Sequence, residues 1–363
     1  MFPVDSISLI RRKLQKLKLD AILLNTSEIT RSTNLRYLSG FTGSDAAILI
    51  NEDQLHLFTD GRYKIQSKIE SPKFRIHVTR GKIASLAKVL RKLGVRNLGV
   101  EGNRISFDYV SALKKAAKEI EVVSFRSQEL ADLRITKDGS ELEMIRKAAQ
   151  VASLACKQLL ETGISGKSEY EVAGRLGSLF KLGGASAESF ETIVASGVRS
   201  ALPHGSPTEK IVQFGDLVVI DYGCMISGYC SDETVTCVVG SPDAEQEKIH
   251  QAVKDAHDRA IEAIKPGVRG NELDRVARET ISKAGYGKYF LHSLGHGVGL
   301  EVHEAPYLAP KSVSVIDSGM VFTIEPGIYI EGFGGVRLES LVYLSSTGPE
   351  ILSRASKSLI SVA

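Results

Sequence analysis

Three of the eight histidines of this 363-residue chain fall in one glycine-rich stretch, HSLGHGVGLEVH, at residues 292–303. They are His292, His296 and His303. Neutral imidazole is the commonest metal ligand in proteins and also serves as an acid or base near neutral pH. A glycine flanks His296 on each side, so the backbone there is free to take tight, open conformations. This spacing favours a functional site, and a metal site would also require carboxylates close by.

Acidic residues interrupt four apolar runs on either side of the histidine stretch. Asp221 ends the run LVVIDYG, and Asp232 opens the run DETVTCVVG. Glu325 lies within VFTIEPGIYI, and Glu339 lies within GGVRLESLVYL. Burying an ionised carboxylate is costly unless the group is paired or binds a metal. We therefore expect the four carboxylates to share one site with the histidines, with Asp221 and Asp232 near one end of an antiparallel hairpin.

These candidate ligands offer mostly carboxylate oxygens and a single imidazole nitrogen. Such a set suits Mn²⁺, Co²⁺, Fe²⁺ or Zn²⁺, and the absence of cysteine from it argues against a structural zinc site. Four carboxylates balance the charge of two divalent ions better than the charge of one. Two such ions can activate water and polarise a carbonyl group, which predicts hydrolysis of an acyl bond.

The order of the five ligand-type residues resembles that of the pita-bread metallopeptidases of family M24. Five motifs resemble the Xaa-Pro peptidase branch, prolidase and aminopeptidase P: SALPHGSPT (200–208), DYGCMISGYCSDETVT (221–236), FLHSLGHGVGLEVHEAP (290–306), TIEPGIYI (323–330) and GGVRLE (334–339). Two further segments resemble the creatinase-type N-terminal domain of that branch, which methionine aminopeptidases lack: YLSGFTGSDAAILI (37–50) and LFTDGRY (57–63).

The resemblance implies a metal-binding role for each matching residue. Asp221 would bind one ion and His296 the other, whereas Asp232 and Glu339 would bridge both. Glu325 would bind the second ion and carry a proton from the attacking water. We therefore expect two divalent ions as the cofactor, namely Mn²⁺, with Co²⁺ or Zn²⁺ as alternatives.

The resemblance also implies contacts with a small peptide that has proline in its second position. His303 would hydrogen-bond the substrate carbonyl or its tetrahedral oxyanion, so it joins Glu325 and His204 in the expected catalytic set. His204 and Arg337 would face the proline side, and Arg337 could pair with the free carboxylate of a dipeptide. His292 would line the pocket.

The hydrogen bonds around the ligands follow the family less closely. Thr234 and Thr323 are expected to donate to the metal-binding carboxylates. The family often has Arg after the threonine of the second aspartate motif and Asp after the last ligand. This chain has Val235 and Ser340 at those positions, which puts the surrounding contacts in doubt rather than the ligands.

The order of strands and helices predicts two domains. Residues 1–132 alternate strands with helices, which is typical of an α/β domain. A capped helix begins within residues 133–150, and helix pairs then precede strand groups twice. We expect a creatinase-type α/β domain at 1–132 and an α+β pita-bread catalytic domain at 133–363.

Composition excludes several other classes of function. The net charge of +3 argues against nucleic acid or an anionic membrane as a partner. The chain has no apolar run of roughly 18 residues or more and no N-terminal signal-peptide pattern. Its cysteines form no CxxC pair, so we expect free thiols in a cytoplasmic homodimer, although a Cys224–Cys237 or Cys230–Cys237 bridge is left open.

The predicted function is metal-dependent hydrolysis of Xaa-Pro bonds by a dipeptidase of the prolidase type. The first alternative is an Xaa-Pro aminopeptidase that acts on longer peptides, because the sequence does not show how the cleft is closed. A creatinase-like amidinohydrolase cleaves without metal and would not be expected to keep all five ligands. Non-catalytic pita-bread modules are a further alternative, and they have lost ligands that this chain retains.

Overall fold

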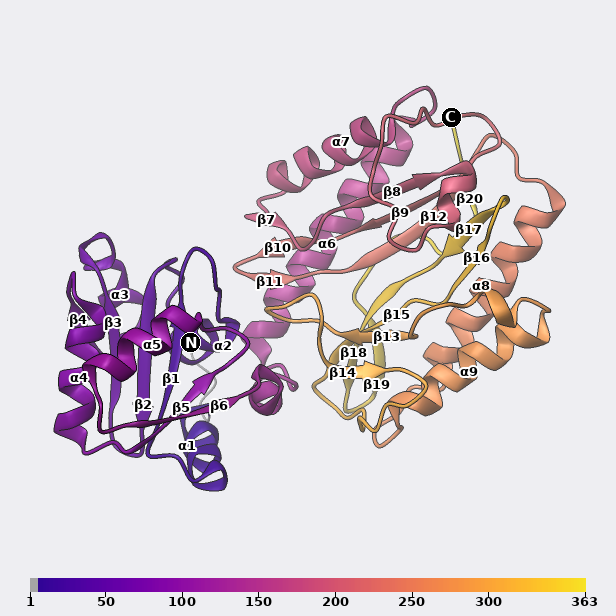
Figure 1. Cartoon of the computed structure of the whole chain (residues 1–363). Helices are drawn as coiled ribbons and strands as arrows, with labels where there is room; N and C mark the ends of the chain where they lie inside the picture. The colour runs from indigo at the N-terminus through magenta and orange to yellow at the C-terminus, as the bar shows by residue number, and fades with distance from the viewer. Residues whose placement is uncertain (1–5) are drawn as a thin grey trace. The chain divides into compact units, whose positions relative to one another are not determined.

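The computed structural model describes residues 6–363 and divides the chain into two compact units, Met1–Arg134 and Ile135–Ala363, called unit 1 and unit 2 below (Figure 1). The first five residues of the expected N-terminal domain lie outside the described residues. No helix in the described part of the chain has the length and apolar character needed to cross a membrane.

Unit 1 is built on a mixed six-stranded sheet. Its strands are β1 (Ala21–Thr26), β2 (Ala46–Asn51), β3 (Leu55–Thr59), β4 (Arg75–Val78), β5 (Asn97–Glu101) and β6 (Glu121–Phe125). Their order across the sheet is β4-β3-β2-β1-β5-β6. The strand β2 pairs antiparallel with β1 and β3, whereas the pairs β3–β4, β1–β5 and β5–β6 are parallel.

Helices cover this sheet and complete an α/β unit, as predicted. They are α1 (Ser6–Leu17), α2 (Thr33–Ser39), α3 (Gln66–Glu70), α4 (Lys82–Leu93) and α5 (Phe107–Ala116), with short 3₁₀ helices at Gly61–Tyr63 and Ser127–Leu133. Leu86 and Leu90 of α4 and Leu113 of α5 are buried in one apolar cluster with Leu23 and Leu49 of the sheet. Burial of these side chains against the strands holds α4 and α5 on the sheet.

The first part of unit 2 is a helix pair followed by strands. Its elements are α6 (Gly139–Glu161), α7 (Glu169–Leu182), β7 (Ala187–Glu188), β8 (Ile193–Ser196), β9 (Leu217–Tyr222), β10 (Cys224–Ile226), β11 (Tyr229–Cys230) and β12 (Glu233–Val239), with a 3₁₀ helix at Gly197–Ala201. The carboxylate of Asp138 accepts from the backbone N–H groups of Ser140 and Glu141 and caps α6. One apolar cluster packs α6 and α7 against β8, β9 and β12.

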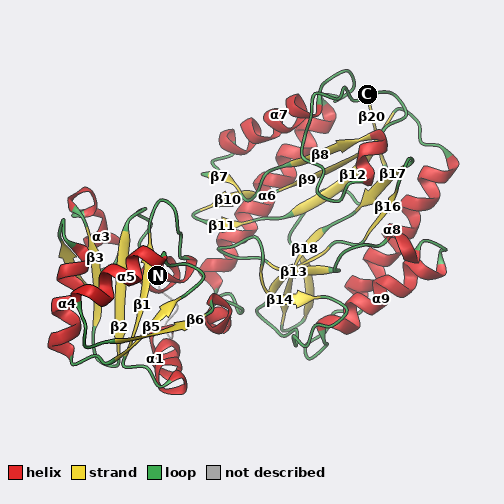
Figure 2. Ribbon diagram, in the orientation of Figure 1, coloured by secondary structure: helices red, strands yellow, loops and turns green. Residues whose placement is uncertain are grey.

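The second part repeats the order of a helix pair before strands. Its elements are α8 (Ala244–Glu262), α9 (Gly270–Lys283), β13 (Gly295–Gly297), β14 (Glu304–Leu308), β15 (Val321–Ile324), β16 (Gly327–Ile330), β17 (Gly334–Arg337), β18 (Ser340–Ser345), β19 (Gly348–Ile351) and β20 (Ile360–Val362), with a 3₁₀ helix at Gly287–Tyr289. A second apolar cluster joins α8 and α9 to β15, β17 and β18. Figure 2 shows α7, α8 and α9 at the periphery of the strands of unit 2.

The sheets of unit 2 bring distant segments together. One has the order β20-β12-β9-β8, another β14-β13-β15-β18-β19, a third β11-β10-β7, and β16 pairs with β17. The antiparallel pairing of β9 with β12 sets Asp221 opposite Thr234, two residues beyond Asp232, which confirms the expected hairpin. The small strands β10 and β11 occupy the turn between its arms. All four cysteines are buried free thiols, as expected, and neither alternative bridge is formed.

Candidate metal centre

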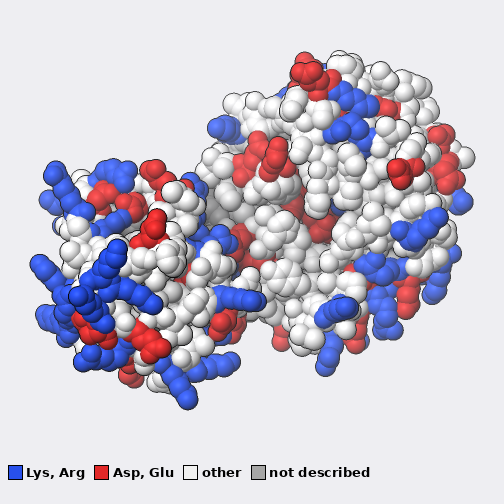
Figure 3. Space-filling view, viewed as in Figure 1, with Lys and Arg blue, Asp and Glu red and all other residues white. Residues whose placement is uncertain are grey.

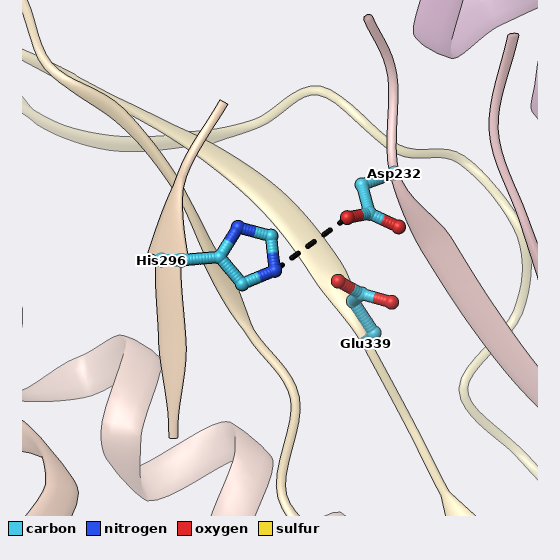
Figure 4. Close-up of side chains that lie close together, drawn as sticks. All are labelled: Asp232, His296 and Glu339. Carbon is cyan, nitrogen blue, oxygen red and sulfur yellow. Dashed lines mark ion pairs between the residues drawn. The ribbon is translucent and has the colours of Figure 1, made fainter. Parts of the chain in front are cut away.

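Three of the expected ligands converge inside unit 2. Asp232 precedes β12, His296 lies on β13, and Glu339 joins β17 to β18. One potential ligand atom from each lies within 4.8 Å of the other two. Figure 4 shows both carboxylates directed toward the His296 ring, whose Nε2 is 3.7 Å from Asp232 Oδ2. This arrangement could hold a divalent ion.

The other two expected ligands border the same cavity. Its volume is about 640 Å³, and its walls include all nine site residues expected from the sequence: His204, Asp221, Asp232, His292, His296, His303, Glu325, Arg337 and Glu339. Glu325 follows β15, and its Oε1 lies 3.2 Å from Nε2 of His296. In the space-filling view, acidic side chains are visible within a hollow on this face of unit 2 (Figure 3).

The glycines beside His296 leave no room for a side chain, because backbone atoms of other segments lie against them. His296 lies in the strand β13, whose pairing with β14 shifts register between His296 and Gly297. A Cβ atom on Gly295 would stand 2.0 Å from the carbonyl oxygen of Thr323, and one on Gly297 would stand 2.2 Å from that of Ala305. Only glycine lets the neighbouring strands approach β13 this closely.

The burial of several carboxylates in one place fits a cationic ligand. The pKa values of Asp232 and Glu339 are raised well above the usual range. Burial is the larger cause, and the negative charge of the neighbouring carboxylates adds to it. The Oδ1 atom of Asp221 is buried and has no hydrogen-bond partner within residues 6–363. Divalent ions would remove this repulsion and supply the missing partner, since hard oxygen donors are their preferred ligands.

His296 is oriented to present Nε2 to the cavity. Its Nδ1 lies 3.2 Å from the carbonyl oxygen of Gly297, a contact that fixes the ring. Burial acts to lower the pKa of His296, but the hydrogen bond to Glu325 raises it overall. Burial acts to raise the pKa of Glu325, but the same hydrogen bond lowers it overall. In the metal-free site these two groups therefore form an ion pair, which a metal ion would replace.

Two threonines hold the carboxylates, as expected. Thr234 Oγ1 donates to Glu339 Oε2 at 2.7 Å, and Thr323 Oγ1 donates to Glu325 Oε1 at 3.3 Å. The backbone N–H of Glu339 also donates to the Thr234 carbonyl at 3.1 Å. The two bonds between Thr234 and Glu339 hold β12 and the β17–β18 connection relative to each other.

The guanidinium of Arg337 is buried and bonded to protein groups. Nη2 donates to Asp221 Oδ2 at 2.7 Å, Nε to Thr234 Oγ1 at 3.2 Å, and Nη1 to the Pro203 carbonyl at 3.1 Å and to the Tyr329 hydroxyl at 2.6 Å. The side chain of Arg337 is only 3% exposed. Its contact with the proline side of a substrate stays a prediction, and the bonds it makes favour a role in orienting Asp221.

Tyr329 is a site residue that the sequence reasoning missed. Its hydroxyl receives the Arg337 bond and lies 2.9 Å from Nε2 of His292. The residue is 3% exposed and lies on β16, within the apolar run of a predicted motif. A tyrosine in such a run usually indicates core packing, so the only available signal was its place beside Glu325 in TIEPGIYI.

The remaining histidines lie around the metal residues. The ring centroid of His303 is 4.2 Å from that of His296, and burial followed by the charge of His296 lowers the pKa of His303. Burial likewise lowers the pKa of His292, whose Nδ1 lies 2.8 Å from the Ser293 carbonyl oxygen. His204 is exposed on the cavity wall. The neutral imidazoles of His292 and His303 can donate or accept a proton.

The two departures from the family have local partners in this chain. Val235 is fully buried in the apolar cluster under α6 and α7. Ser340 Oγ lies 3.0 Å from Nε2 of His257, and the other ring nitrogen lies 2.9 Å from Asp258 Oδ1. Burial lowers the pKa of His257, so its neutral ring accepts from Ser340 and anchors the residue next to Glu339.

Comparison with protein families matches both units. Residues 143–346 match the model of metallopeptidase family M24, and residues 7–136 match that of the creatinase/prolidase N-terminal domain. The chain is 39% identical to an Xaa-Pro dipeptidase of Pyrococcus horikoshii over 96% of each sequence.

Solved structures give the same result for the fold. An Xaa-Pro dipeptidase from Bacillus anthracis superposes with a TM-score of 0.94 at 38% identity and covers 99% of both chains. An X-Pro aminopeptidase from Thermotoga maritima superposes with a TM-score of 0.90 at 38% identity, over 96% of this chain and all (100%) of the other. These matches confirm the creatinase-type N-terminal domain and the pita-bread catalytic domain expected from the sequence.

Proposed function

This chain belongs to metallopeptidase family M24, and we propose that it is an Xaa-Pro dipeptidase that binds two divalent ions. The observation that carries the proposal is the gathering of five ligand-type side chains on one cavity wall, three of them with ligand atoms within 4.8 Å of one another. The peptide substrate would lie in this cavity with proline in its second position.

We assign the metal-binding residues as follows. Asp221 and His296 would each hold one ion, Asp232 and Glu339 would be shared by both, and Glu325 would complete the site of the second ion. The unpartnered Oδ1 of Asp221 and the raised pKa values of Asp232 and Glu339 support the assignment. When bound, two such ions polarise the scissile carbonyl and activate water for attack.

The side chains of the chain supply proton transfer and charge stabilisation. Glu325, which lines the cavity beside His296, accepts a proton during attack and passes it on, the role that the resemblance implies. His303, beside His296 on the cavity wall, donates to the oxygen on which negative charge develops. His204 and His292 line the cavity for the proline ring, which needs apolar contact and no acceptor for an N–H group.

The choice between a dipeptide and a longer peptide separates this proposal from its alternative. The similarity to an Xaa-Pro dipeptidase of Pyrococcus horikoshii favours a dipeptidase, whereas the similarity to the Thermotoga maritima structure keeps an Xaa-Pro aminopeptidase as the second candidate. The deciding experiment is an assay of Ala-Pro and Ala-Pro-Ala with added Mn²⁺. Faster cleavage of Ala-Pro supports the dipeptidase, and cleavage of Ala-Pro-Ala alone would replace it with the aminopeptidase.

We also propose Mn²⁺ as the ion and the cytoplasm as the compartment. Four carboxylates and one imidazole form a hard ligand set that suits Mn²⁺. Four buried free thiols fit a reducing compartment. Comparing turnover with Mn²⁺, Co²⁺ and Zn²⁺ under equal loading tests the choice of ion.

A further inference from the structure

One acidic side chain on the cavity wall takes no part in the metal site. The lining carries five carboxylates, of which Asp221, Asp232, Glu325 and Glu339 are the assigned ligands and Glu191 is the fifth. Glu191 is exposed and makes no hydrogen bond or ion pair with any residue of the described range 6–363. It is therefore free to bind a group from solution.

The position of Glu191 places it close to the metal residues. Ile193, two residues later, is the Cα partner of Asp221 across the β8–β9 pair. Two residues of extended chain span at most about 7 Å. Glu191 and Ile193 both line the cavity, while Thr192 between them is buried and bonds to Glu188 at 3.0 Å. Glu191 therefore borders the same cavity as Asp221.

The charges around Glu191 leave its own charge uncompensated. Arg337 is the one Lys or Arg among the described residues of the lining, and its guanidinium is buried against Asp221. The assigned metal carboxylates are buried or half-buried and would be neutralised by two divalent ions. Glu191 is then the charged side chain that an incoming substrate meets on the open wall.

We propose that Glu191 selects substrates with a basic residue at the Xaa position, an inference that rests on the proposed Xaa-Pro peptidase function. The proline ring carries no charge, so the side chain of Xaa is the part of an Xaa-Pro substrate that can supply a variable positive charge. The long side chains of Lys and Arg can bring an ammonium or guanidinium group to the wall. An ion pair this open to water adds about 2–5-fold.

The test compares Lys-Pro with Met-Pro, whose uncharged side chain has a similar length. For the metal-loaded wild type, kcat/KM for Lys-Pro should exceed that for Met-Pro by about 2–5-fold, and the excess should shrink as salt is added. Glu191→Gln should remove the difference by slowing Lys-Pro alone. Glu209→Gln is the matched control, because Glu209 is also exposed and lies outside the cavity lining.

A charge reversal makes the test two-sided. Glu191→Lys should favour Glu-Pro over Gln-Pro, whereas the wild type should favour Gln-Pro. If Glu191→Gln slows Lys-Pro and Met-Pro equally, Glu191 binds the common α-ammonium group and the selectivity proposal is wrong. Equal rates on both substrates in the wild type overturn only this inference. Absence of cleavage of any Xaa-Pro substrate overturns the proposed function and this inference with it.

Discussion

Arg337 and Asp221 form a buried ion pair in which Nη2 lies 2.7 Å from Oδ2, so one oxygen of the Asp221 carboxylate is held by the protein. The other oxygen, Oδ1, is buried without a hydrogen-bond partner among residues 6–363. A carboxylate held in this way has its other oxygen available to a cation. We therefore expect Arg337 to act on the proposed metal site through Asp221.

Replacing Arg337 should affect both types of substrate equally. We expect Arg337→Met to lower Mn²⁺ content and to reduce kcat/KM for Ala-Pro and Ala-Pro-Ala by the same factor. Unfolding stability should fall by about 3 kcal/mol, because a buried carboxylate loses its partner. Arg199→Met is the control. Arg199 Nε lies 3.1 Å from an oxygen of the buried Glu169, and neither residue is an assigned ligand. A rise in KM for Ala-Pro alone would instead place Arg337 at the proline carboxylate.

In the metal-free protein, Asp232 and Glu339 should contribute less to stability as the pH rises. Burial raises the folded-state pKa of Asp232 and Glu339, so above pH about 4 these two carboxyls hold more protons in the folded metal-free chain than in the unfolded chain. Their contribution to stability is therefore greatest at low pH and falls as the pH rises toward the raised pKa values. The lowered pKa values of His292 and His303 act in the opposite sense, so the measurement is the difference in urea unfolding between chelator-treated wild type and Glu339→Gln at pH 5 and at pH 8.

Two substitutions should change the metal-free stability in opposite directions. Glu339→Gln keeps the acceptor for Thr234 and removes a repelling charge, so at pH 8 it should stabilise the metal-free protein. Asp221→Asn should destabilise it, because Arg337 loses its partner. Metal-free Glu339→Gln that unfolds more easily than wild type at pH 8 would show that the carboxylates do not repel.

His303 should act on turnover rather than on metal binding. Its ring packs edge-on against the His296 ring with centroids 4.2 Å apart, and its proposed role is to stabilise charge on the reacting oxygen. We expect His303→Ala to retain both ions and to lower kcat about 10²–10³-fold. Metal analysis and kinetics on one preparation test this. Loss of an ion from the variant would make His303 a ligand.

A buried ion pair next to His303 should hold its loop in place. Lys137 Nζ lies 2.9 Å from Glu304 Oε1, and their side chains are 1% and 4% exposed. Lys137→Met leaves a buried charge and should cost about 3–5 kcal/mol, with a larger fall in kcat than rise in KM. The double variant Lys137→Met/Glu304→Leu should recover part of the stability, since it removes both charges. Wild-type stability in Lys137→Met would show that the pair does not support the loop.

The candidate ligands could be proposed from the sequence because burial of a carboxylate is costly wherever it occurs. Asp221 and Glu325 interrupt apolar runs, and that pattern is visible without any knowledge of the fold. The helices were predictable from caps and periodicity, as with Asp138 at the start of α6. The meeting of β9 and β12 with β13 and β15 depends on pairing between distant segments. The cost of burying these carboxylates predicted a shared site, and the resemblance to a family supplied the fold in which the segments meet.

Other features depend on contacts that no local pattern encodes. The charge of Arg337 is evident from the sequence, but the direction of its side chain is set by Asp221, Thr234 and Tyr329. Tyr329 resembles a core residue until its hydroxyl is seen to join Arg337 and His292. The reason for Gly295 is likewise a carbonyl on another strand, that of Thr323.

The most direct test of the account is a titration of metal-free protein with Mn²⁺ while proline release from Ala-Pro is measured. With protein well above the dissociation constants, the account predicts that the rate rises until two ions are bound per chain and then stays constant. Asp232→Asn, which lacks a proposed bridging ligand, should bind fewer ions and release little proline. Full activity with one ion per chain, or activity that persists in excess chelator, would contradict the proposed two-metal site.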